Sequence, residues 1–519
     1  MRSHVTGPYL WFPVEKEKPE VKLHFYLDGQ KFQEIDIQLG GAEKDLYTCM
    51  YVGDYMGREL EIRSDAPKEL LRGISFHADK VQDAYPFRPQ LHFSPEIGWH
   101  NDPNGLVYAD GLYHLYYQWN PYGVLWGNMH WGHAVSRDLF TWEHRPMAIA
   151  PDVYGTAYSG CAWIDKDDRT GYGKNALLFY YTAAGGRNAW SKEAGHLFTQ
   201  RLKVSTDGGD TLTRSDQFLI GHVAGENRDP KIFYHKESSA YIMLLYLDGY
   251  EFAIYRSEDL LNWQETCRLS IKGMWECPDL FCLLVENGDG EEKKWVFWSA
   301  DGYYVIGDFD GYTFTQESPV QMAYGTKLPY AAQSYAGVED RVISVAWLRM
   351  ENDWGDYRGL MSIPAEVSLV RDGEGYKVRL QPVRELAALR QERKELEKGC
   401  KHTGIGLGGV PLEADLAWDL LEKGQTKLHL GNYDIIVDHA EKVIRFYELE
   451  KHLDMAAVPF SRKDGLTLKL IVDQEVVEFY GNDGMIYGAV EMKENILQET
   501  LTMDSDVELR SMSWCRLVR

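Results

Sequence analysis

A degenerate internal repeat occupies residues 90 to 365 and constrains the fold more than any other feature of the chain. A polar turn between two apolar strands recurs with starts at residues 136, 205, 257 and 308, which are 69, 52 and 51 residues apart. The likeness is closest between Ser136–Trp142 and Ser257–Trp263. Repeats of this period have the size of four-stranded units and are typical of the blades of a β-propeller.

A second series of polar side chains runs in step with the first. Its members lie at or beside the starts of apolar strands: Asp102, Ser159, Asp229, Glu276 and Gln333. Five units in this stretch predict a five-bladed propeller. Because the innermost strands of a propeller converge on its axis, we expect Asp102, Asp229 and Glu276 to surround one funnel.

Strand patterns also flank the repeat, so the whole chain is predicted to be all-β. Near the N-terminus, Asp28 and Gly29 separate two alternating segments, which is a hairpin signature. Near the C-terminus, alternating segments follow a charged stretch with interleaved Leu and Ala that favours a short helix. The expected order is an N-terminal β module at 1–85 with a proline-containing link at 85–89, the five-bladed β-propeller at 86–380, a connector at 381–399 and a C-terminal β-sandwich at 400–519.

Charge and cysteine usage exclude several classes of protein. The formal net charge of -24 disfavours binding to nucleic acid or to an anionic membrane. Seven scattered cysteines without CxxC spacing argue against a disulfide framework or a zinc site. Residues 1–20 show no signal peptide, so we expect a cytoplasmic protein, and an extracellular one only if a leader has been removed.

Three carboxylates, an arginine and aromatic side chains in one pocket suit the cleavage of glycosides. Each acid also has a structural explanation: Asp102 and Asp229 both precede a proline and can cap a turn, and Glu276 can lie on the surface. Together with His100, the three acids could instead bind a cation. The chain has no calcium-binding loop and no HExxH pair, so we expect no metal and no cofactor.

Three segments together resemble the signatures of glycoside hydrolase family 32, which includes invertases, inulinases, levanases and fructan exohydrolases. The likeness extends over residues 88 to 519, and the N-terminal module is similar to one that precedes some bacterial levanase-like members. The three segments are Trp99–Gly105, Arg228–Pro230 and Trp275–Asp279. Further segments that resemble the family are Tyr117–Pro121, His130–Ser136, Tyr158–Gly160 and Ala332–Ser334.

The resemblance implies a five-bladed propeller, a β-sandwich and a retaining double displacement. By position, Asp102 matches the nucleophile, Glu276 the acid/base and Asp229 the stabiliser of the transition state. The residues expected to bind the terminal fructose are Asn101, Gln118, Trp126, Ser159 and Arg228, and the further substrate-binding candidates are Trp99, Tyr158, Cys277, Gln333 and Trp347. His100 and Cys161 depart from the residues common in the family, which leaves the pocket floor and the substrate preference open.

A retaining mechanism makes two physical demands on the pair of carboxyl groups. They should lie about 5–5.5 Å apart. Asp102 should be ionised while Glu276 is protonated, so their surroundings should push the two pKa values apart.

The favoured hypothesis is an exo-acting β-fructosidase that cleaves sucrose, fructo-oligosaccharides or fructans. A fructosyltransferase would use the same three acids. A fructan-binding propeller that has lost its catalytic activity is a second alternative. A propeller that cleaves arabinan or xylan would also use two Asp and one Glu, but with inversion. The expected partner is a fructoside substrate, not nucleic acid or a membrane, and the N-terminal module or the β-sandwich could form a homo-oligomer.

Overall fold

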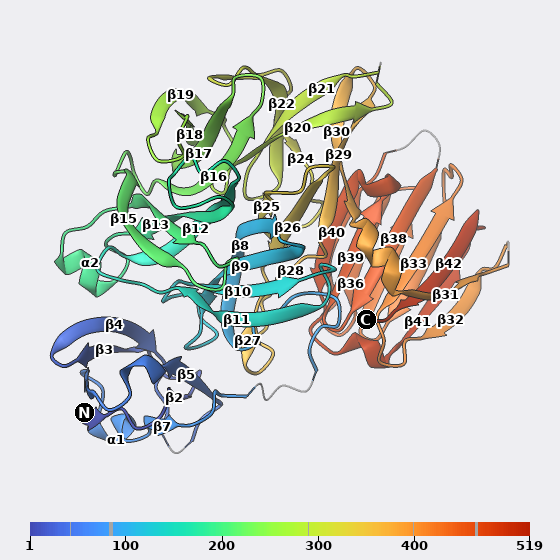
Figure 1. Cartoon of the computed structure of the whole chain (residues 1–519). Coiled ribbons are helices and arrows are strands. Elements are labelled where there is room, and N and C mark those ends of the chain that lie inside the picture. Colours follow the sequence, from blue (N-terminus) through green and yellow to red (C-terminus); the bar gives the residue numbers. More distant parts are fainter. Residues whose placement is uncertain (42, 83–86, 289, 398, 462–464) are drawn as a thin grey trace.

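The computed structural model describes residues 1–519 except 42, 83–86, 289, 398 and 462–464, and it does not describe the side chains of 214–217. Residues 85 and 86 of the predicted link lie outside the described residues. The chain forms an N-terminal module, a β-propeller and a β-sandwich in that order (Figure 1). Within the described ranges, no helix is long and apolar enough to cross a membrane.

The N-terminal module contains two small sheets that enclose their own core. Asp28 and Gly29 have φ angles of 48° and 84°, as a tight turn between two paired strands requires, so the predicted hairpin is confirmed. One sheet has the order β1 (Arg2–His4), β6 (Glu59–Arg63), β3 (Val21–Leu27) and β4 (Gln30–Ile37), and the other β5 (Leu46–Tyr51), β2 (Tyr9–Val14) and β7 (Ser75–His77). Short helical turns lie at η1 (Gly53–Tyr55) and α1 (Lys68–Leu71).

The propeller begins with three separate antiparallel meanders. A short helix, α2 (Ala189–Glu193), interrupts the second of them. The first meander contains β8 (Gly98–Ala109), β9 (Leu112–Asn120), β10 (His130–Ser136) and β11 (Trp142–Ile149), and β27 (Tyr357–Arg358) joins it in parallel. The second contains β12 (Thr156–Asp165), β13 (Ala176–Ala184), β14 (Thr199–Ser205) and β15 (Thr213–Ile220), and the third β16 (Arg228–His235), β17 (Ala240–Asp248), β18 (Glu251–Ser257) and β19 (Gln264–Ser270).

The fourth and fifth predicted units share one hydrogen-bonded sheet, because β20 and β29 pair in parallel at Val285 and Leu369. The predicted propeller is confirmed. Because two of the five predicted units share a sheet, the number of five blades stays a prediction. The fourth unit contains β20 (Asp279–Glu286), β21 (Lys293–Trp298), β22 (Tyr303–Phe309), β23 (Phe314–Gln316) and β24 (Gln321–Met322). The fifth contains β25 (Pro329–Ser334), β26 (Val342–Leu348), β28 (Leu360–Met361), β29 (Ala365–Asp372) and β30 (Gly375–Pro382).

The repeated motif is the turn between the third and fourth strands of a unit. In the first unit, Ser136 Oγ accepts the N–H of Leu139 at 2.8 Å, and Asp138 Oδ1 accepts that of Thr141 at 2.6 Å. The third unit repeats this arrangement at Ser257 and Asp259. The serine and aspartate therefore recur because their side chains satisfy the backbone N–H groups of the same turn.

The C-terminal sandwich packs two sheets around an apolar core, and it includes the 3-10 turns η3 (Asn482–Gly484) and η4 (Ile496–Gln498). The predicted helical connector is wrong over most of its length, because only η2 (Arg384–Leu389) is helical and residues 390–395 form a strand that pairs with residues 511–517. One sheet has the order β31 (Arg390–Glu395), β42 (Ser511–Leu517), β33 (Leu412–Trp418), β38 (Leu466–Asp473), β39 (Val476–Gly481) and β40 (Ile486–Glu491). The other has the order β32 (His402–Gly406), β41 (Thr500–Ser505), β34 (Gln425–Leu430), β35 (Tyr433–Asp438), β36 (Val443–Glu448) and β37 (Leu453–Pro459).

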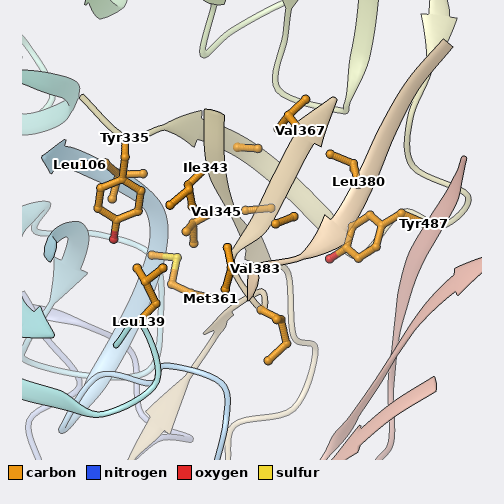
Figure 2. Packing of buried hydrophobic residues seen from close by; sticks show 14 of the residues in the cluster. Leu106, Leu139, Tyr335, Ile343, Val345, Met361, Val367, Leu380, Val383 and Tyr487 are labelled. Atoms are coloured by element: carbon orange, nitrogen blue, oxygen red, sulfur yellow. The ribbon is translucent and has the colours of Figure 1, made fainter. Parts of the chain in front are cut away.

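The propeller and the sandwich share one hydrophobic core. Figure 2 shows Leu106 and Val345 of the propeller in the same cluster as Tyr487 of β40. A buried ion-pair network lies at the same junction, where the His92 imidazole contacts Asp473 at 2.9 Å and Glu478 at 3.2 Å. These two carboxylates raise the pKa of His92 to about 9 against the opposing effect of burial. The sandwich therefore packs against the propeller through both apolar and charged contacts.

Candidate active site

A pocket of about 280 Å³ lies where the first strands of the propeller units meet. The strands β8, β12 and β16 lie side by side, and β25 lies beside β8 (Figure 1). The first parts of β8, β12 and β16 carry Asp102, Ser159 and Asp229, and Glu276 lies in the segment just before β20. The structure therefore brings together three acids that are far apart in the sequence. The residues that line the pocket are Asn101, Asp102, Gln118, Trp126, Tyr158, Ser159, Arg187, Glu226, Arg228, Asp229, Glu276, Tyr330 and Trp347.

Asp102 lies on β8 at an irregularity in the strand. The register between β8 and β9 shifts between His100 and Pro103, which is the effect of a bulge that re-aims a side chain. Ser159 Oγ donates a hydrogen bond of 2.7 Å to Asp102 Oδ2, and Asn101 Nδ2 donates one of 3.1 Å to Oδ1. Both carboxylate oxygens are thus held by neutral donors, which orient the group without neutralising its charge.

Gly105 completes this segment because no larger residue fits there. Its φ angle is 52°, and a Cβ atom would lie 2.9 Å from the ring of Tyr116. The glycine lets β8 pass close to this buried ring. The motif is therefore more than a turn, since it fixes the path of the strand that carries Asp102.

Asp229 is almost completely buried at the start of β16, in a left-handed backbone conformation with a φ angle of 63°. Its own N–H donates to Thr182 Oγ1 at 3.1 Å, and its Oδ2 atom accepts the N–H of Cys277 at 3.0 Å. A non-glycine residue in this conformation is strained and must be held by its surroundings. Here the bonds from two neighbouring units supply that restraint.

Glu276 lies in the segment before β20, where Glu276 and Cys277 have consecutive positive φ angles of 53° and 43°. Arg228 Nη2 donates to Glu276 Oε1 at 2.5 Å, and the Tyr330 hydroxyl donates to Oε2 at 2.6 Å. Trp275 Nε1 in turn donates to the Tyr330 hydroxyl at 3.1 Å. The strained backbone turns Glu276 into the pocket, Arg228 and Tyr330 fix its orientation, and Trp275 holds Tyr330 in place.

Burial dominates the pKa values of two acids in the pocket. Burial raises the pKa of Asp102 above its ordinary value, although the hydrogen bonds from Ser159 and Asn101 act in the opposite direction. Burial also raises the pKa of Asp229 to about 7, with Arg228 lowering it and the neighbouring acids Asp102 and Glu276 raising it. Burial thus outweighs the hydrogen bonds at Asp102 and the single arginine at Asp229. The expected separation of the pKa values of the two catalytic carboxyl groups stays a prediction.

We expect the Asp229→Asn variant to be more stable than the wild type at pH 8, with a melting temperature about 2–4 °C higher. A buried carboxyl group with a raised pKa favours folding while it is protonated, below its unfolded pKa near 3.8, and loses this contribution as the pH rises through about 7. An asparagine still accepts the Cys277 N–H and carries no charge. Thermal unfolding followed by circular dichroism at pH 4 and pH 8 measures the difference.

The comparison at pH 4 is the internal control for this prediction. There the wild-type carboxyl group is protonated in the folded state and close to half protonated in the unfolded state, so the melting temperatures of the two proteins should differ much less than at pH 8. A variant that melts lower than the wild type at pH 8 would show that the charge of Asp229 stabilises the fold.

Most of the substrate-binding candidates from the sequence line the pocket, and three do not. Trp99 does not line the pocket itself but supports Asn101, which does, because Trp99 Nε1 donates to Asn101 Oδ1 at 2.9 Å. Cys277 is buried with its Sγ atom 3.7 Å from Asp102 Oδ2 and 3.5 Å from Asp229 Oδ2. Gln333 is buried on β25, away from the pocket lining. The candidates that line the pocket are Asn101, Gln118, Trp126, Tyr158, Ser159, Arg228 and Trp347.

The structure adds Arg187, Glu226 and Tyr330 to the pocket. Arg187 and Glu226 form an ion pair at the mouth, where both side chains are partly exposed. The sequence contained a weak signal for two of these residues, since Glu226 precedes Arg228 by two positions and Tyr330 begins the segment that contains Gln333. Arg187 lies on the turn between β13 and α2, and no catalytic candidate lies near it in the sequence.

The two departures from the family pattern lie outside the pocket lining. His100 is fully buried, and its ring is stacked on Phe93 with a centroid distance of 5.9 Å. Burial lowers the pKa of His100 to about 3, so this imidazole is neutral. Cys161 is buried in the core between the second and third units. Within the described parts of the chain, no group of three or more His, Cys, Asp or Glu side chains is arranged to hold a metal ion.

Comparison with known proteins identifies the family. The family model for the glycosyl hydrolases family 32 N-terminal domain matches residues 92–382. A levanase from Bacillus subtilis (strain 168) is 33% identical over 472 residues, which cover 80% of this chain and 68% of the levanase. An extracellular exo-inulinase from Aspergillus awamori is 29% identical over 420 residues, which cover 69% of this chain and 76% of the inulinase.

Solved structures show the same fold. The exo-inulinase from Aspergillus awamori superimposes with a TM-score of 0.73 at 24% identity, covering 84% of this chain and 99% of the inulinase. A fructofuranosidase from Schwanniomyces occidentalis, in complex with fructose, superimposes with a TM-score of 0.74 at 24% identity, covering 85% of this chain and 100% of its own. The family model spans more than half of this chain, and the levanase is similar along most of it. The chain therefore belongs to glycoside hydrolase family 32.

Proposed function

We propose that this protein is a retaining, exo-acting β-fructosidase that removes terminal β-D-fructofuranosyl residues from sucrose, fructo-oligosaccharides or fructans. The observation that carries this proposal is the convergence of Asp102, Asp229 and Glu276 on one small pocket. The relatives support the substrate class, since they include proteins named levanase, exo-inulinase and sucrose-6-phosphate hydrolase.

In the first step, an oxygen of Asp102 attacks the anomeric carbon of the terminal fructose. The bond between this carbon and the glycosidic oxygen breaks, and Glu276 gives its proton to that oxygen. The products are a fructosyl ester on Asp102, an ionised Glu276 and the free leaving sugar. Ser159 and Asn101 keep the Asp102 carboxylate in position for this attack.

In the second step, a water molecule replaces the leaving sugar. Glu276 takes a proton from the water while the water oxygen attacks the anomeric carbon, and the bond to Asp102 breaks. Both acids return to their starting states. Two displacements at one carbon retain its configuration, so the fructose is released as the β-anomer.

Asp229 lies beside the site of both displacements. Its Oδ2 atom is within reach of the Cys277 thiol, which is also close to Asp102. A carboxylate at this position accepts hydrogen bonds from fructose hydroxyl groups, and these bonds strengthen as positive charge develops on the sugar ring. Asp229 thus binds the transition state more tightly than the substrate.

A substrate panel with product analysis tests the proposal. Purified protein is incubated with sucrose, kestose, inulin and levan, and we expect free fructose as the main product, released one residue at a time from the chain end. Proton NMR spectra recorded before mutarotation should show the β-anomer first. An initial α-anomer would contradict retention, and longer oligosaccharides as the main products from sucrose would indicate a transferase.

A further inference from the structure

We propose that the N-terminal module, residues 1–82, positions the rim of the substrate pocket and thereby helps to select the leaving-group sugars. The inference rests on the proposed function. In the structure, this module contacts two segments that each carry a rim residue, Trp126 and Arg187. The contacts lie on β4, which lies next to α2 (Figure 1).

The first contact fixes the segment 121–129, which carries Trp126. Tyr122 is buried in the hydrophobic core of the module, where its ring lies 6.0 Å from that of Phe12 in an edge-on arrangement. At the other end of the segment, the Asn128 side chain accepts the N–H of Asp36 at 2.8 Å and donates to its carbonyl oxygen at 2.7 Å. Trp126 therefore lies between two residues, Tyr122 and Asn128, that are both held by the module.

The second contact fixes the turn that carries Arg187. Glu34 is buried, and its Oε1 atom accepts the N–H of Trp190 at 3.1 Å. Lys31 forms an ion pair with Glu34 and lies 5.3 Å from the centroid of the Trp190 ring. Asn188, between Arg187 and Trp190, accepts the N–H of Ser191 and so joins the turn to α2. A displacement of α2 would consequently move Arg187.

The rim residues and the catalytic acids are held in place by different contacts. The acids are held by bonds among the propeller units, from Ser159, Arg228 and Tyr330. Trp126, which the family resemblance assigns to the terminal fructose, is 51% exposed and therefore belongs to the rim, and Arg187 is paired with Glu226 at the mouth. In an exo-acting enzyme the terminal fructose occupies the bottom of the pocket, so the leaving sugars extend along this rim. The module should thus influence the binding of longer substrates more than the rate of bond cleavage.

The test uses the full-length protein with two single substitutions, Glu34→Ala and Asn128→Gly. Glycine is chosen because Asn128 has a φ angle of 46°, which glycine adopts without strain. For a fructan tetrasaccharide we expect KM to rise about five- to tenfold, the effect of losing one or two positioning hydrogen bonds, while kcat changes less than about twofold. For sucrose both constants should change less than about twofold.

Two control variants separate positioning from general damage to the module. Glu34→Gln keeps an oxygen that accepts the Trp190 N–H, so the KM for the tetrasaccharide should return to within about twofold of the wild type. Asp28→Asn breaks an exposed ion pair with Arg58 in the same module and should change nothing. Tetrasaccharide binding to the Asp102→Asn variant, with and without Glu34→Ala, gives the same comparison without turnover.

The possible results distinguish this inference from the proposed function. A wild-type protein that cleaves no fructoside contradicts the proposed function, whatever the variants do. A wild-type protein that cleaves fructosides, with tetrasaccharide KM values unchanged in both Glu34→Ala and Asn128→Gly, contradicts the inference alone. An equal loss of kcat on sucrose and on the tetrasaccharide also contradicts it, because the module would then support the whole site rather than its rim.

Discussion

Replacement of Asp102 by asparagine is expected to lower kcat on sucrose by about 10⁴-fold or more while the protein remains folded. An amide does not form the fructosyl ester, so the first displacement has no nucleophile. The fold should tolerate the change because the Ser159 hydroxyl can accept a hydrogen bond from the new amide, and Asn101 can still donate to the remaining oxygen. Initial rates of fructose release and a thermal unfolding curve measure both parts of the prediction.

The matched control for this variant is Ser159→Ala. It removes the 2.7 Å hydrogen bond to Asp102 and leaves the carboxylate in place, so we expect a loss of only about 10- to 100-fold. If Asp102→Asn retained a tenth or more of the wild-type rate, Asp102 would not be the nucleophile, and the roles of the three acids would have to be reassigned.

Replacement of Glu276 by glutamine is expected to lower kcat on sucrose by about 10²- to 10⁴-fold, because the leaving oxygen then departs without a proton. The loss should depend on the substrate. An aryl fructoside whose phenol is a good leaving group needs little protonation, so the first displacement should proceed at a rate close to that of the wild type. Water attack in the second step lacks its general base, so the fructosyl ester should accumulate.

Rapid mixing of the Glu276→Gln variant with an aryl fructoside measures this difference. We expect a burst of phenol close to one equivalent of enzyme, followed by slow turnover that added azide accelerates, since azide attacks the ester without a general base. The Asp102→Asn variant serves as the control and should give no burst. A Glu276→Gln variant with an unchanged rate on sucrose would show that another group is the acid.

Local patterns in the sequence predicted the repeated parts of the fold. The Ser136 and Ser257 turns are recognisable because each turn satisfies its own backbone N–H groups with side chains a few residues away. The hairpin at Asp28 follows the same logic, since the turn conformation depends on two adjacent residues. The helical connector was mispredicted because its strand is specified by pairing with Ser511–Leu517 at the far end of the chain.

The site was only partly predictable for the same reason. The signatures around Asp102, Arg228 and Glu276 are short and contiguous, and the resemblance to the family located them. Tyr330 and Arg187 enter the pocket from other units through the closure of the propeller. Gln333 fitted the pattern of strand starts, but the structure places its side chain in the interior. The cytoplasmic location and the count of five blades stay predictions.

The sequence by itself determined the all-β class, the repeated unit and the three acids, because each depends on contacts within a few residues. Only the tertiary structure decided which donors hold those acids, since Ser159 reaches Asp102 across 57 positions and Arg228 reaches Glu276 across 48. It also decided the surroundings of Asp229, where burial overcomes the nearby arginine. Contacts between distant segments form only when the propeller closes and the N-terminal module packs against it. The burial of the acids arises in the same way, and no local pattern encodes either.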